Sequence, residues 1–233
     1  MDFLNSSDGQ TFKQVLSQAI LKRLDGKNHL SILDAGSGPG WLSKLLADGG
    51  HKVKACDISP QLIAKAKADY PKIDFQIADL TKPLPYADAE FDCVILSLSA
   101  LDLHDQKKAF LEIKRIIKSG GRLIIITVNP YYGFPIGVWK RGIIGRLLMK
   151  KPVLRLCSYF DFARKTDRSF LWNDGKLTSY FYTLPEQINL LIDLGFAVNH
   201  LEDIKAEQDD KKYSLKYRLY RYPIFILIEL LKQ

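Results

Sequence analysis

The sequence predicts an α/β fold, with a doubly wound, mostly parallel sheet that is flanked by helices. Short apolar runs of strand length, each ending in a small polar or acidic residue, alternate with amphipathic stretches of helical length. Such alternation requires crossover connections, which give parallel strands with helices on both faces. The 233 residues are 47% hydrophobic and 26% charged, which is typical of a globular chain and excludes a disordered one. We expect a single domain, residues 1–233.

The expected elements follow one another along the chain. Apolar residues at helical spacing predict a first helix over 12–24, which Gly26 ends. Five apolar runs then predict strands at 30–34, 53–57, 73–79, 91–97 and 122–128. A helix over 184–195 and two final strands, 196–204 and 222–230, complete a sheet of seven strands.

Segment 131–183 departs from this alternation. It is rich in aromatic residues, and between Tyr131 and Arg168 nine Lys and Arg stand against two Asp, so this stretch carries nearly all of the net charge of +8. The apolar face of Val138–Leu148 predicts a helix, which Pro152 ends. We therefore expect a basic, helical insertion after the fifth strand, and we interpret it as a lid over the substrate.

Polar residues close four of the predicted strands. Asp34, Asp57, Asp79 and Ser97 each stand at the end of an apolar run. In a parallel sheet these ends share one edge, and ligands of open α/β sheets bind outside that carboxyl edge. Three aspartates at such an edge favour a binding site over a core, because buried carboxylates are costly unless they are paired.

A glycine loop, DAGSGPG, follows the first strand and begins at Asp34. Glycines in a strand-to-helix turn allow positive φ and let backbone amides approach a ligand. A G-x-G-x-x-G dinucleotide loop would need a third glycine at position 41, which is Trp41, and the Lys-Ser/Thr pair of a phosphate loop is absent as well. The spacing D-x-G-x-G-x-G therefore indicates a different ligand.

Together with the sequence around it, this loop resembles that of the class I S-adenosylmethionine-dependent methyltransferases. Four segments agree with the family in order and spacing: ILDAGSGPG, ACDIS, IADLTKPLPYADAEFDCVI and SGGRLIIIT. The resemblance covers residues 12–129, with a looser match at 179–198. It implies a Rossmann-like fold, S-adenosyl-L-methionine as the methyl donor and S-adenosyl-L-homocysteine as the product.

The resemblance also implies roles for individual residues. Asp34 would order the loop and the methionine ammonium group, and Asp57 would accept hydrogen bonds from both ribose hydroxyls. Asp79 would accept a hydrogen bond from the adenine amino group. The other cofactor-binding residues that it implies are Gly36, Gly38, Gly40, Ile58, Leu80 and Ser97.

Methyl transfer from a sulfonium depends chiefly on alignment of nucleophile, methyl group and sulfur. A general base is needed only if the acceptor must lose a proton. His104 follows the fourth strand at a loop-to-helix junction and is the candidate base, with a structural role at the helix start as the alternative. Asp102 and Asp105 are expected at that helix start, where the macrodipole favours acids. Alternative catalytic residues are three tyrosines that could bound the acceptor site, Tyr131, Tyr132 and above all Tyr182.

The acceptor is the least defined part of the prediction. We favour a small hydrophobic or aromatic molecule under the insertion. The basic segment 138–168 is also consistent with peripheral contact to an anionic membrane. Its aromatic residues are consistent with binding to RNA. We rank RNA and protein substrates below a small molecule. A further alternative is an inactive partner subunit that binds the cofactor without turnover.

Three scattered cysteines, Cys56, Cys93 and Cys157, form no CxxC pair, so neither a disulfide framework nor a zinc site is predicted. No histidine has ligand spacing, and we propose no metal. Acidic residues and the lack of a basic, apolar leader near the start speak against a secretory signal. We therefore expect a cytoplasmic protein; the sequence indicates no oligomeric state.

Overall fold

The computed structural model describes residues 5–27, 29–131, 137–140, 153–156, 169–172, 177–180, 182–207 and 215–233. The helices are α2 (Ser7–Leu24), α3 (Trp41–Asp48), α4 (Pro60–Asp69), the 3-10 turn η1 (Ala100–Asp102), α5 (Gln106–Ile116), α8 (Leu184–Asp193) and α9 (Leu215–Arg221). The main strands are β1 (Ser31–Ala35), β2 (Lys52–Asp57), β3 (Asp74–Ile77), β4 (Phe91–Ser97), β5 (Ile117–Val128), β10 (Phe196–Ile204) and β11 (Phe225–Lys232).

These seven strands form one sheet in the order β10-β11-β5-β4-β1-β2-β3. Strand β11 is antiparallel to both β5 and β10, whereas β1 to β5 pair in parallel. The order reverses between β1 and β4, which is the switch point where open α/β sheets bind ligands. The predicted doubly wound, mostly parallel sheet of seven strands is confirmed.

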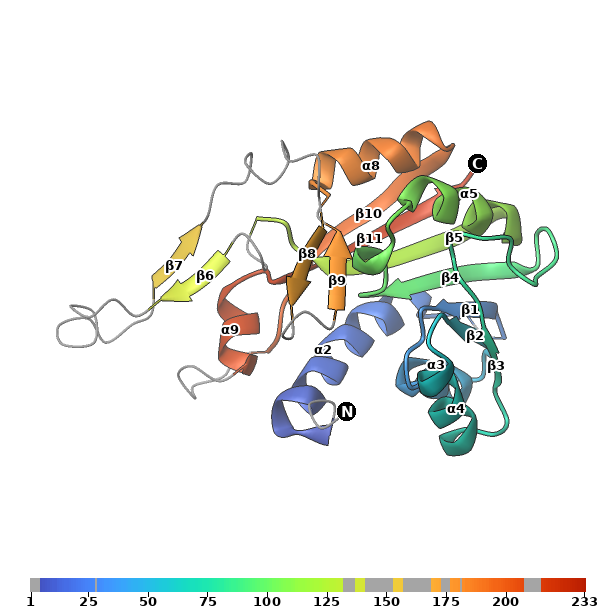
Figure 1. Cartoon of the computed structure of the whole chain (residues 1–233), viewed down its shortest axis with the longest axis horizontal. Coiled ribbons are helices and arrows are strands. Elements are labelled where there is room, and N and C mark those ends of the chain that lie inside the picture. The colour runs from blue at the N-terminus through green and yellow to red at the C-terminus, as the bar shows by residue number, and fades with distance from the viewer. Residues whose placement is uncertain are drawn as a thin grey trace.

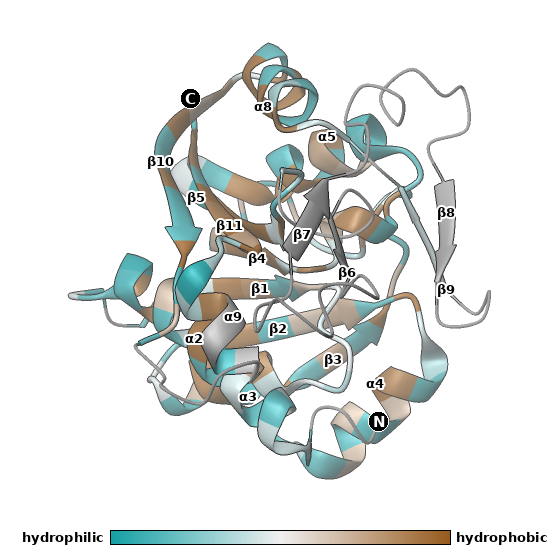
Figure 2. Ribbon diagram, turned by 90° about the vertical axis from the view of Figure 1, so that its left-hand side faces the viewer, coloured by the Kyte–Doolittle hydropathy of each residue, from teal (hydrophilic) through white to brown (hydrophobic). Residues whose placement is uncertain are grey.

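Helices cover both faces of the sheet (Figure 1). One buried cluster joins α2 and α3 to one face of the central strands, and a smaller cluster packs α4 against β2 and β3. The cluster on the other face contains α5 and Leu191 of α8. In Figure 2 the central strands are mostly hydrophobic while the helices carry both kinds of residue, as expected for amphipathic layers around a core.

Local signals set the start of the helices near the carboxyl edge. Ser59 caps α4 and accepts a hydrogen bond from the Leu62 amide, and Pro60 occupies its first turn. Asp105 caps α5 by accepting from the Lys108 amide, as expected for an acid at a helix start. These caps bring the loops after β2 and β4 to a defined position at the edge of the sheet.

The prediction of a helical insertion after the fifth strand is wrong for the described part of segment 131–183. That part forms two strand pairs, β6 (Gly137–Lys140) with β7 (Val153–Leu156) and β8 (Ser169–Trp172) with β9 (Leu177–Tyr180). The expected helix over 138–148 therefore starts as a strand. Val138 and Trp139 belong to the residue types that favour strands, which outweighs the helical spacing.

Most of the basic stretch, including 141–152 and 157–168 with Cys157, lies outside the described residues, as does Tyr132. Among the residues that the structure describes, no helix has the length and apolar character needed to cross a membrane.

Candidate functional site

A cavity of about 300 Å³ opens at the carboxyl edge of the sheet, at the switch point. Its walls come from two halves. The β2–β3 half contains the loops after β2 and β3, lined by Asp57, Ile58, Ser59, Leu62, Ala78, Asp79, Leu80 and Thr81. The β4 half contains the segment after β4, lined by Ser99, Asp102, Leu103 and His104, and Gly36 lies in the cavity wall as well.

The glycine loop at this edge is shaped by close approach to the β4 half. Gly36 has φ +75°, and a Cβ there would lie 2.3 Å from the Cβ of Ser99. Ser99 in turn donates a hydrogen bond from Oγ to the carbonyl oxygen of Ala35 at 2.7 Å. The first glycine therefore lets the end of β1 and the chain after β4 touch.

Gly38 differs from Gly36 in what surrounds it. Its φ is +54°, and a Cβ there would meet no atom within 4 Å. The loop thus exposes open space beside Gly38, while Gly40, with φ +82°, forms the N-cap of α3. Ser37 lies between Gly36 and Gly38, and its hydroxyl is buried and has no hydrogen-bond partner among the described residues. A buried hydroxyl without a partner points to a polar ligand atom.

Asp57 ends β2 as predicted and lines the cavity. Its Oδ2 accepts a hydrogen bond from the Gly38 amide at 2.8 Å, and its Oδ1 accepts one from the Ser59 amide at 2.9 Å. Two backbone amides from different loops therefore fix the carboxylate, and each oxygen keeps a second acceptor position for a ligand.

Asp34 lies below the loop and does not line the cavity. It is 1% exposed, and Ser43 of α3 donates a hydrogen bond from Oγ to its Oδ2 at 2.6 Å. Burial raises the pKa of Asp34 to about 6; the Ser43 hydrogen bond opposes this shift and the charge of Asp57 adds to it. The residue therefore ties β1 to α3, and reaches a ligand only through the loop above it.

Asp79 lies two residues beyond β3 and not at its end, because β3 stops at Ile77. Its Oδ1 accepts hydrogen bonds from the amide and the hydroxyl of Thr81. Burial raises the pKa of Asp79, but the Thr81 hydrogen bonds and the Lys82 ammonium outweigh it, so the pKa is lowered. Asp79 stays ionised, and with the exposed Ile58 and the buried Leu80 it forms the outer part of the cavity.

The β4 half begins with an unusual backbone. Leu98 has φ +63°, which is rare for a non-glycine residue, and its amide is held by the carbonyl oxygen of Ile126. This bend turns the chain so that Ser99 lines the cavity. The predicted Ser97 ends β4 but is not in the lining. The sequence offered no signal for this bend, since Leu gives no hint of a left-handed residue.

Asp102 also lines the cavity, although the sequence suggested only a helix-start acid. It is the last residue of η1 and is exposed toward the cavity. Ser179 of β9 donates a hydrogen bond from Oγ to Asp102 Oδ1 at 2.8 Å. Removal of water by the surrounding protein raises the pKa of Asp102; the Ser179 hydrogen bond opposes this and the charge of Asp57 adds to it. A contact between residues 77 positions apart could not be found from the sequence.

His104 lies in the cavity wall between η1 and α5, at the predicted junction. Its ring faces that of Tyr180 with 6.3 Å between ring centroids. The other predicted residue, Tyr182, is not in the lining; its hydroxyl donates to the backbone carbonyl of His104 at 3.5 Å. Strand β9 and the residues after it therefore pack on the β4 half.

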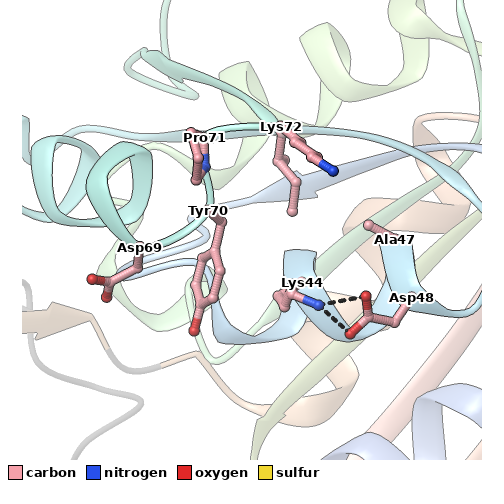
Figure 3. A pocket seen from close by; sticks show the side chains of 8 residues that line it. Lys44, Ala47, Asp48, Asp69, Tyr70, Pro71 and Lys72 are labelled. Atoms are coloured by element: carbon pink, nitrogen blue, oxygen red, sulfur yellow. Dashed lines mark hydrogen bonds and ion pairs between the residues drawn. The ribbon is translucent and has the colours of Figure 1, made fainter.

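A larger cavity, about 460 Å³, lies where α3 and α4 end, at the opposite edge of the sheet (Figure 3). It is lined by Tyr70 and Pro71 and by the Lys44–Asp48 ion pair on α3. Its charged groups are largely neutralised by each other, and it contains none of the residues at the switch point. No group of His, Cys, Asp and Glu among the described residues could hold a metal ion.

Comparison with known proteins shows similarity to methyltransferases in sequence and in fold. Residues 33–125 match the family model of the methyltransferase domain. The chain is 34% identical over 124 residues to a demethylmenaquinone methyltransferase of Paenarthrobacter aurescens, which is 53% of this chain and 47% of the relative. It is 32% identical over 112 residues to a malonyl-[acyl-carrier protein] O-methyltransferase of Enterobacter lignolyticus, 48% of this chain and 44% of the relative. The matches thus span about half the length of these relatives.

The fold is shared over a longer stretch. The crystal structure of an S-adenosylmethionine dependent methyltransferase from Mesorhizobium loti superposes with a TM-score of 0.75 at 24% sequence identity. The superposition covers 92% of this chain and 96% of that chain. The architecture described above, including β10 and β11, is therefore that of a known fold.

Proposed function

We propose that the chain is an S-adenosylmethionine-dependent enzyme that methylates a small hydrophobic or aromatic acceptor, because residues 33–125 match the family model of the methyltransferase domain. The observation that carries the proposal is the fixed carboxylate of Asp57 at the switch point, beside a loop with open space at Gly38. Such a carboxylate suits a ribose, whose two hydroxyls need two acceptor oxygens.

The residues present fit the cofactor. Asp57 would hold the ribose, while Ile58 and Leu80 would enclose the adenine and Asp79 would accept from its amino group. The loop from Gly36 to Gly40 would run beside the methionine moiety, and the buried Ser37 hydroxyl within this loop has no hydrogen-bond partner among the described residues. When bound, the cofactor supplies an activated methyl group on a sulfonium.

The residues of the chain would align the acceptor and remove its proton where the reaction requires this. In an in-line displacement the S–CH₃ bond breaks as the bond from methyl to acceptor forms, so positioning carries most of the catalysis. His104, in the cavity wall, is the proposed general base for an acceptor that must lose a proton. Tyr182 would act through the backbone of His104 and so would position that residue.

The acceptor class is supported by the apolar part of the lining and by the relatives. On the acceptor side Leu103 provides apolar surface, and Tyr180 adds an aromatic ring behind His104. The relatives act, by name, on demethylmenaquinone and on malonyl-[acyl-carrier protein]. We propose a small, apolar acceptor, with segment 131–183 as its cover.

Cofactor binding is the first test. Titration calorimetry with S-adenosyl-L-homocysteine should give tight binding to the wild type and about a 100-fold loss in Asp57→Asn, since two hydrogen bonds to a charged group are weakened. Asp74→Asn, which removes an exposed acid at the start of β3, is the matched control. Wild-type affinity in Asp57→Asn, with an unchanged melting temperature, would contradict the proposal.

Turnover is the second part of the same test. Transfer of a labelled methyl group should be followed with demethylmenaquinone, reduced to its quinol, and with a malonyl thioester. Binding of S-adenosyl-L-homocysteine without transfer to any small molecule would favour an inactive partner subunit. Labelling of RNA or protein, or turnover only on anionic vesicles, would assign the basic insertion to one of those partners.

A further inference from the structure

The two halves of the cavity face each other with acids on both sides. Asp57 and Asp79 belong to the β2–β3 half, and Asp102 belongs to the β4 half. In the proposed function Asp57 and Asp79 bind the cofactor, whereas Asp102 has no role. Asp102 is exposed toward the cavity, and no Lys, Arg or His in the described parts of the chain forms an ion pair with it.

Among the described residues, one side chain donates a hydrogen bond to the Asp102 carboxylate. Ser179 is buried, and its hydroxyl donates to one carboxylate oxygen, which leaves the second oxygen for a ligand. Ser179 belongs to the β8–β9 pair, in the segment expected to cover the acceptor, and its neighbour Tyr180 packs on His104. The Asp102 carboxylate is thus held by the covering segment. We therefore assign it to the acceptor side of the cavity.

We propose that Asp102 is a specificity-determining residue, which accepts a hydrogen bond from a hydroxyl group at the reacting end of the acceptor. This inference rests on the proposed function and names its substrate class: hydroxyl-bearing acceptors, with carboxylate acceptors disfavoured. Ser179 is the positioning residue, because its hydrogen bond keeps the Asp102 carboxylate at the cavity wall.

Electrostatic interactions explain why the site should prefer a hydroxyl group over a carboxylate. An ionised acceptor carboxylate in the β4 half would meet the negative charge of Asp102 at short range and that of Asp57 across the cavity. A hydroxyl donates a hydrogen bond to the same carboxylate, and a hydrogen bond to a charged acceptor is among the stronger kinds. Discrimination by one such group amounts to about tenfold or more.

The test uses acceptor pairs that differ only in this group. Binding of 2-naphthol and 2-naphthoate, and of 1-octanol and octanoate, should be measured by calorimetry on the complex of the protein with S-adenosyl-L-homocysteine. The wild type should bind the hydroxyl member of at least one pair about tenfold more tightly. Asp102→Asn keeps the shape and the acceptor for Ser179, and should reduce that preference about tenfold.

Matched variants separate this role from a structural one. Asp105→Asn removes the same charge three positions away, outside the cavity lining, and should leave the preference unchanged. Ser179→Ala should reduce it several-fold, and Thr178→Ala, on the exposed side of β9, should not. Affinity for S-adenosyl-L-homocysteine should stay within twofold in all four variants.

Three results would overturn the inference. The first is an unchanged preference in Asp102→Asn, and the second is a tenfold loss of S-adenosyl-L-homocysteine affinity in that variant, which would make Asp102 a cofactor residue. The third is a wild-type complex that prefers the carboxylates or binds none of the four probes. Failure of the wild type to bind S-adenosyl-L-homocysteine itself would instead contradict the proposed function.

Discussion

The two halves of the cavity are built in different ways. In the β2–β3 half, Asp57 is fixed by backbone amides of two short loops, one of them the glycine loop that follows β1. In the β4 half, a left-handed Leu98 turns the chain, and Asp102 is oriented by a serine from β9, far along the sequence. The first arrangement joins residues at most 19 positions apart on the paired strands β1 and β2, whereas the second joins residues 77 positions apart and exists only once the whole sheet and the β8–β9 pair are assembled.

This difference assigns distinct tasks to the two halves. A site fixed by backbone amides suits a ligand that never changes, such as a cofactor, because amides hold the same geometry whatever the side chains are. A site made by side chains of a separate segment can vary without disturbing the cofactor. Substitutions in the two halves should therefore change different measured quantities.

Among substitutions in the β4 half, His104→Ala should have the largest effect on turnover. We expect turnover to fall about 10² to 10⁴-fold, the usual contribution of a general base, with little change in S-adenosyl-L-homocysteine affinity. Steady-state rates and calorimetry on the same preparation measure both. His200→Ala, on the edge strand β10, is the control. Near wild-type turnover would assign His104 to structure.

Gly36→Ala should damage the glycine loop and the β4 half at once, because Gly36 is where these two segments touch. The new Cβ would lie 2.3 Å from Ser99 and would add strain at φ +75°, so unfolding free energy should drop by about 3 to 4 kcal/mol. Gly26→Ala, with φ +70° and no atom within 4 Å of its Cβ, has the strain without the clash and should cost about 1 kcal/mol. Equal losses in urea unfolding would show that the contact is unimportant.

Asp34 should make stability depend on pH. Its pKa of about 6 in the folded chain, against 3.8 unfolded, means that the folded state holds a proton that the unfolded state has lost. Stability from this group is present below about pH 4 and is lost as pH rises to about 6, by roughly 3 kcal/mol.

The measurement is the difference in unfolding free energy between Asp34→Asn and the wild type, followed from pH 4 to 7. Taking the difference removes the titration of other carboxyl groups. The advantage of the Asn variant should grow with pH up to about 6 and then level off. A constant difference would mean that Asp34 titrates normally in the folded chain.

Much of the fold could be predicted because the positions and spacing of apolar residues reflect which residues are buried in strands and helices. Seven strands occur in the predicted order, and the end of β2 at Asp57 and the junction at His104 lie where expected, although β3 ends two residues before Asp79. The helix predicted over 138–148 is wrong where the structure describes it, at 138–140, because its spacing competed with residue types that favour strands. Ser97, which the structure leaves outside the cavity lining, could not be distinguished from Ser99 without the bend at Leu98.

By itself, the sequence determined the order of the strands along the chain, the glycine loop and the acids that follow neighbouring strands, since each depends on residues close to one another. Only the tertiary structure decided that Asp34 lies under the loop, that Ser99 touches Gly36, and that Ser179 meets Asp102. Contacts of that kind depend on the relative placement of distant segments, which is set by packing of the whole sheet and leaves no mark in the local pattern of residues.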